Sequence, residues 1–139
     1  MRRVIPIAVL AFAVGCGSSG PRLVPVSGIV LIDGKPLPFG VVQVAPEGGR
    51  AASGRIGPDG RFTLTTFVEG DGCYVGSHPV AVVGTESINA GSQRWHAPMK
   101  YASSAESGLT VSIDGPTSSL KIELTWAGGK PFVQHFGKE

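Results

Sequence analysis

Two cysteines and three histidines are the residues of this 139-residue chain with the widest range of nucleophilic or metal-binding chemistry. Cys73 and His78, five positions apart, could act as a nucleophile and its base. Catalysis would also need an orienting partner and an oxyanion site, and the sequence shows neither. His78, His96 and His135 have no ligand-pair spacing, although zinc needs three or four converging ligands. We therefore expect no catalysis, no metal and no cofactor, with Cys73 a small buried hydrophobe.

The other cysteine closes an apolar segment that follows a basic start. Arg2-Arg3 precedes the run Val4–Val14, whose 11 residues suit the core of a secretion signal and are too few to span a bilayer. Ala13-Val14-Gly15-Cys16 resembles a lipobox, the motif of bacterial lipoproteins. In that family the cysteine thiol receives a diacylglyceryl group, and cleavage before the cysteine frees an amine that is acylated. The resemblance implies cleavage between Gly15 and Cys16 and lipidation of Cys16.

Ordinary secretion is the alternative, because Ala11-Phe12-Ala13 is a small-x-small cleavage site. Under the lipoprotein interpretation, several acyl chains on one residue give stable anchoring, where a single chain binds marginally. Gly17-Ser18-Ser19-Gly20 has the composition of a flexible linker. We expect a signal peptide over residues 1–15, a lipidated cysteine and tether over 16–23, and an exported protein anchored by lipid to a bacterial membrane of the cell envelope.

The charge balance argues against nucleic acid as a partner. The chain has 12 Lys and Arg residues and 10 Asp and Glu residues, for a net charge of +2. Both surplus charges are the arginines of the signal, so the mature domain has equal numbers of basic and acidic residues. Binding to a phosphate backbone depends on a basic surplus. The expected partners are the membrane, through the lipid, and an envelope protein or a glycan.

The remaining chain has the pattern of an all-β domain. Clean alternation of apolar and polar residues, typical of half-buried strands, occurs in Arg61–Thr65, Leu109–Asp114 and Leu120–Trp126. Strand-like segments with less alternation are Val26–Ile32, Val41–Ala45, Ala51–Ile56 and Val80–Val83. Because Pro79 has no backbone donor, the last of these is expected to begin after it or to lie at an edge.

Turns separate these segments. Asp33, Asp59, Asp71 and Asp114 each precede a glycine. Their spacing matches no calcium-binding loop, and Asp-Gly is what tight turns favour, so we interpret all four as turn residues. Seven short strands with this punctuation predict a seven-stranded antiparallel β-sandwich.

The order of motifs resembles the transthyretin-like, carboxypeptidase regulatory-like domains. Asp33-Gly34-Lys35-Pro36-Leu37 is similar to the turn after their first strand, and Val42–Pro46 to their next apolar run. Pro58–Leu64 resembles their "DGRF" hairpin, and Pro98–Tyr101 with Ser107–Thr110 points to short bacterial lipoproteins built on this domain. The resemblance implies an Ig-like Greek-key sandwich over residues 24–126, followed by a C-terminal tail over 127–139.

Thr85–Ser107 is expected to be one long loop, and it holds the most suggestive cluster, Arg94, Trp95, His96 and Tyr101. Aromatic and hydrogen-bonding side chains on a loop suit contact with a ligand or partner. Alternatively, Trp95 and Tyr101 anchor the loop onto the sandwich, since aromatics carry large apolar area.

The sequence therefore predicts a non-catalytic, membrane-anchored lipoprotein whose β-sandwich has a structural or recognition role at the cell envelope. The alternative is a carbohydrate-binding module on a lipid tether, with Trp95 and Tyr101 as stacking residues. A third hypothesis, which the residues favour least, is a hydrolase that uses Cys73 or a histidine.

Overall fold

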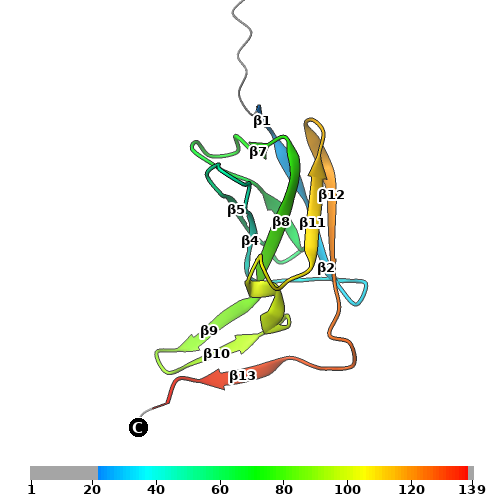
Figure 1. Ribbon diagram of the computed structural model, residues 1–139. Coiled ribbons are helices and arrows are strands. Elements are labelled where there is room, and N and C mark those ends of the chain that lie inside the picture. The colour runs from blue at the N-terminus through cyan, green and yellow to red at the C-terminus, as the bar shows by residue number, and fades with distance from the viewer. Residues whose placement is uncertain (1–21, 138–139) are drawn as a thin grey trace, which may run out of the picture.

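The computed structural model describes residues 22–137, and this part of the chain is almost entirely β-structure (Figure 1). It contains thirteen strands and one short 3₁₀ helix, η1 (Met99–Ala102). The predicted signal peptide, Gly15 and Cys16 lie outside the described residues. Within residues 22–137, no helix is long and apolar enough to cross a bilayer.

The predicted all-β sandwich is confirmed, and each of the seven expected segments contains a strand. One four-stranded sheet has the order β11-β8-β4-β5, formed by Leu109–Ile113, Gly76–Val83, Val41–Val44 and Ala52–Arg55. The other has the order β12-β2-β3, with β6 also beside β2, formed by Thr117–Leu124, Val26–Ile32, Lys35–Pro36 and Arg61–Thr63.

One strand pair departs from the expected antiparallel arrangement. β12 runs parallel to β2, with Ile122 opposite Val30 and Leu124 opposite Ile32. β12 follows β11 through the turn at Asp114-Gly115-Pro116, which carries the chain from one four-stranded sheet to the other. A crossing between sheets leaves the direction of the new strand free, whereas a hairpin within one sheet forces antiparallel pairing.

The alternating segments place their apolar residues in the core as predicted. Phe62 and Leu64 are buried, while Arg61 and Thr63 are exposed. Inward-facing side chains of both sheets make one cluster, which includes Val26, Val30, Val42, Val44, Val80, Val82, Ile113, Ile122 and Leu124. Such a shared core between two sheets is what holds a sandwich together.

Pro79 lies inside β8, so the expectation that the strand begins after it or lies at an edge was wrong. β8 begins at Gly76 and runs between β4 and β11. The carbonyl of Pro79 accepts a hydrogen bond from the amide of Ala45, one residue beyond the end of β4. A residue's N and C=O point to the same side of a strand. The nitrogen of Pro79, which has no hydrogen to donate, therefore faces the end of β4. The hydrogen bonds between β8 and β11 are kept.

β8 runs from one end of the sandwich to the other (Figure 1). At its start, β7 (Cys73–Tyr74) pairs with β1 (Leu23–Val24). Beyond its end lies a three-stranded sheet of order β13-β10-β9, formed by Phe132–His135, Ser92–Trp95 and Thr85–Asn89. At about 3.3 Å per residue, an eight-residue strand is roughly 25 Å long. The first strand of the domain and the three-stranded sheet are thus at opposite ends.

Candidate functional site

The segment Thr85–Ser107 is not the single long loop that the sequence suggested. It forms the β9–β10 hairpin, followed by η1. β10 pairs with β9 on one side and with β13 on the other. Residues 127–139 were expected to be a tail outside the domain, yet β13 lies in them and completes this sheet. Arg94, Trp95 and His96 therefore lie on or beside a strand, and Tyr101 lies in η1.

Trp95 and Tyr101 are anchored side chains. Trp95 is 6% exposed, its indole nitrogen donates to Gln134 Oε1 at 2.9 Å, and its ring stacks on Phe132 with centroids 6.3 Å apart. Tyr101 is 5% exposed, and its hydroxyl donates to the carbonyl of Thr125 at 3.3 Å and accepts from the Thr125 amide at 3.2 Å. Buried in this way, neither ring offers a free face to a sugar.

Arg94 and His96 lie on the opposite face of the sheet from Trp95, because alternate residues of a strand face opposite ways. Both contact Glu86 of β9. His96 Nε2 donates to Glu86 Oε2 at 2.7 Å, and Arg94 Nη1 lies 3.9 Å from the same oxygen. The His96 ring also stacks on Phe39, with centroids 4.9 Å apart. The structure thus brings two of the four predicted residues together around one carboxylate.

β13 and the exposed apolar side chains around it were not predicted from the sequence. Phe132, Val133, Phe136 and Ile88 are exposed on or next to the three-stranded sheet. Val133 is directly opposite Arg94, so it shares the face with Glu86. The run Phe132-Val133-Gln134-His135-Phe136 has no alternation of apolar and polar residues, so no local signal marks this strand. Phe132 is opposite Trp95, so it lies on the other face of the sheet, and Val133 is the β13 apolar side chain beside the charged groups.

Cys73 is a buried hydrophobe, as the sequence analysis expected. It belongs to the core cluster, and burial raises its pKa from 9.0 to about 11, so the thiol stays protonated at neutral pH. His78 is also buried, and its Nε2 lies 2.8 Å from the carbonyl oxygen of Tyr74. A carbonyl only accepts, so Nε2 carries a proton and is engaged by the backbone. Neither group is arranged as a nucleophile or a base.

Three of the four Asp-Gly aspartates bond to their own turns or to a neighbouring strand end. Asp59 accepts from the amide of Arg61 and Asp71 from three backbone amides, while Asp33 accepts from the Thr125 hydroxyl and the Trp126 amide. Among residues 22–137, no group of three or more His, Cys, Asp or Glu side chains could hold a metal ion.

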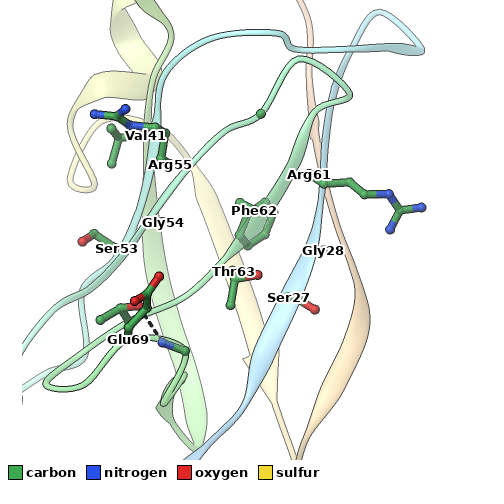
Figure 2. Close-up of a pocket in the computed structure, with 13 residues that line it drawn as sticks. Ser27, Gly28, Val41, Ser53, Gly54, Arg55, Arg61, Phe62, Thr63 and Glu69 are labelled. Carbon is green, nitrogen blue, oxygen red and sulfur yellow. Dashed lines mark hydrogen bonds between the residues drawn. The ribbon is translucent and has the colours of Figure 1, made fainter.

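A groove of about 880 Å³ lies where β6 leaves β2 and meets β5 (Figure 2). Beyond β6, Thr65 bridges to Ser53, so this part of the chain joins the two four-stranded sheets. Figure 2 shows Arg55 and Arg61 pointing away from one another, and the ring of Phe62 is buried. Hydroxyls line the groove, but its charged groups do not converge on one point and no aromatic face is open to a ligand.

The strongest candidate site is therefore the three-stranded sheet, with Glu86, Arg94, His96 and Val133 on one face. Glu86 holds Arg94 and His96 in place, and this face leaves no reactive atom poised. Comparisons with protein-family models, with curated proteins and with solved structures found no match to this chain.

Proposed function

We propose that this protein is a non-catalytic bacterial lipoprotein, anchored through Cys16, whose transthyretin-like sandwich presents a recognition surface at the cell envelope. The observation that carries the proposal is that β1 and the three-stranded sheet lie at opposite ends of the sandwich. β1 begins at Leu23, seven residues after the predicted lipidated cysteine, and the three-stranded sheet lies at the far end of the sandwich (Figure 1).

This arrangement supports recognition away from the bilayer. A membrane anchor at the β1 end would leave the three-stranded sheet facing outward. On the face that carries Glu86, Arg94 and His96, that sheet exposes Val133, and Phe39 stacks on the His96 ring, so apolar and charged groups lie together as in protein interfaces. Trp95 and Tyr101 are unsuited to stacking on a sugar, because both rings are buried and hydrogen-bonded.

The anchor is tested by intact mass and by detergent partitioning of the full chain expressed in a bacterium. The wild type should begin at Cys16, carry a diacylglyceryl group and an N-terminal acyl chain, and enter the detergent phase. Cys16→Ser should abolish both results. Cys73→Ala is the matched control, since it removes the other cysteine and should be processed like the wild type. An unmodified N-terminus at Val14 would contradict the anchor and indicate ordinary secretion.

The recognition surface is tested by photo-crosslinking in cells that produce the anchored protein. A crosslinking amino acid at Val133, on the face with Arg94, should give one discrete adduct with a protein or glycan of the envelope. The same group at Thr110, exposed on β11 of the sandwich, is the control and should give none. Absence of a discrete adduct at Val133 in an anchored protein would contradict the recognition role.

A further inference from the structure

The most exposed large apolar side chains outside the three-stranded sheet are Phe67 and Val68. They are 58% and 69% exposed, and they occupy the tip of the loop between β6 and β7. We call these two residues the apolar tip. Exposed apolar side chains that sit together and point into solvent often mark contact with a partner or a membrane.

The apolar tip belongs to an ordered loop. Asp71 Oδ1 accepts from the Thr66 amide at 2.7 Å, and Oδ2 accepts from the amides of Phe67 and Val68, each at 2.9 Å. The Thr66 hydroxyl donates to the carbonyl of Gly72 at 2.7 Å. The loop is therefore fixed by its own polar groups, and its apolar side chains are held outward instead of folding back onto the sandwich.

The loop lies at the end of the sandwich that carries β1. It leads directly into β7, whose Cys73 pairs with Val24 and whose Tyr74 pairs with Leu23 (Figure 1). The amide of Val75 also donates to the carbonyl of Arg22. The apolar tip and the start of the domain are thus joined by a short, hydrogen-bonded stretch of backbone.

Chain length keeps this end close to the predicted anchor. Seven residue steps separate Cys16 from Leu23, and at about 3.5 Å each they reach at most about 25 Å. A bilayer that held the acyl chains of Cys16 would lie within this distance of β1. The apolar tip therefore lies on the part of the domain nearest to the bilayer.

The charges around the apolar tip fit a membrane interface. The guanidinium carbon of Arg50 lies 5.2 Å from the centroid of the Phe67 ring, so the cation sits on the aromatic group. Arginine beside apolar groups lets the charge stay at the headgroup level while the apolar part enters the interface. Glu47 lies in the turn that carries Arg50, and Glu69 lies in the loop that carries Phe67. This end of the domain therefore has no basic surplus, and its contact with a membrane does not require anionic lipid.

We infer that Phe67 and Val68 insert into the interface of the bilayer that holds the lipidated Cys16, giving the domain a second membrane contact and a fixed orientation. The inference rests on the proposed lipid anchor. Two points of attachment at one end would direct the three-stranded sheet away from the membrane.

The test uses the mature protein purified from bacteria that express the full chain, mixed with vesicles of zwitterionic phosphatidylcholine, with and without brominated acyl chains that quench indole fluorescence. In the variant Val68→Trp the fluorescence emission of the added indole should shift to shorter wavelength and be quenched by the brominated lipid. The matched control is Ile88→Trp, which places an indole at a 44% exposed position of β9 at the opposite end. Its fluorescence, and that of native Trp95 and Trp126, should not respond.

The outcomes separate this inference from the anchor. If Val68→Trp floats with the vesicles but is not quenched, the second membrane contact is wrong and the lipid anchor stands. If the protein does not float with the vesicles at all, the anchor is wrong and the second contact falls with it. Should Val68→Trp fail to fold, Phe67→Trp repeats the measurement with one aromatic side chain replacing another.

Discussion

The side-chain oxygen of Gln134 accepts hydrogen bonds from the indole of Trp95 and the amide of Gln93, at 2.9 and 3.0 Å. Gln134 lies on β13, and the other two residues lie on β10. One side chain near the C-terminus therefore fixes the strand that carries the predicted site residues. The bond between Trp95 and Gln134 joins β10 to β13 across 39 residues of chain, in addition to the backbone pairing of the two strands.

Trp95→Ala should destabilise the protein by about 3–5 kcal/mol, because it removes a large buried aromatic and leaves a cavity. The same exchange at Ile88, exposed on the same hairpin, should change the free energy of unfolding by less than about 0.5 kcal/mol. Urea unfolding measures both. A loss below about 1 kcal/mol in Trp95→Ala would mean that the ring does not anchor the sheet and would reopen its role in binding.

Asp71→Asn should loosen the loop that carries Phe67 and Val68. Backbone hydrogen bonds lower the pKa of Asp71 below 3.8; the bond from the Thr66 amide has the largest effect, and those from the Val68 and Phe67 amides add to it. The asparagine would place an NH₂ group against the two amides that now donate to Oδ2. Hydrogen exchange at Phe67 and Val68 should become faster.

Asp59→Asn is the matched control, because Asp59 accepts one backbone bond through Oδ1 and asparagine keeps that acceptor.

The pH dependence follows from the lowered pKa of Asp71. The stabilisation that ionised Asp71 gives the loop is fully present above the ordinary aspartate pKa. It is lost as the pH falls through the lower pKa that Asp71 has in the folded protein. Exchange at Phe67 and Val68 that is unchanged in Asp71→Asn and flat across this acidic range would contradict the role of the carboxylate.

The sandwich could be predicted from the sequence because its signals are local. Alternation in Arg61–Thr65 or Leu120–Trp126 reports which side of each strand faces the core, and burial matches it. Asp33-Gly34 likewise predicts its own turn. Both residues have positive φ, 48° and 80°, and Ile32 pairs with Lys35 across them.

The three-stranded sheet could not be predicted in the same way. Thr85–Asn89 and Ser92–Trp95 are mostly polar, so no apolar period distinguishes them from a loop. Their order comes from pairing with β13 and from the burial of Trp95, both of which join parts of the chain far apart in sequence. The parallel pairing of β12 with β2 is non-local in the same sense, since strand direction leaves no mark on the side-chain pattern.

Cys73→Ala should leave the fold intact and cost about 1–3 kcal/mol, because the thiol fills core space and performs no chemistry. Burial raises the thiol pKa from 9.0 to about 11, so the thiolate is disfavoured in the folded state only. Unfolding is therefore favoured as the pH rises from about 9 to about 11, and stability falls over that range. Urea unfolding at several pH values should show this fall in the wild type and a smaller one in Cys73→Ala. Rapid reaction of the folded thiol with a disulfide reagent at neutral pH would contradict the burial.

Gly72→Ala should be among the most damaging single changes in the domain. Gly72 has φ +91°, and a Cβ there would collide with the carbonyl oxygen of Val24, in the strand that begins the domain. Gly48→Ala is the matched control, since Gly48 has φ +70° with no atom within 4 Å of an added Cβ. The control should lose about 1–2 kcal/mol from the left-handed backbone alone, whereas Gly72→Ala should lose more than about 4 kcal/mol. Because the collision pushes β1 away from β7, amide exchange at Val24 and Tyr74 should rise in Gly72→Ala and stay unchanged in Gly48→Ala. Equal losses in the two variants would show that the close approach of Gly72 to Val24 does not hold this end of the sandwich together.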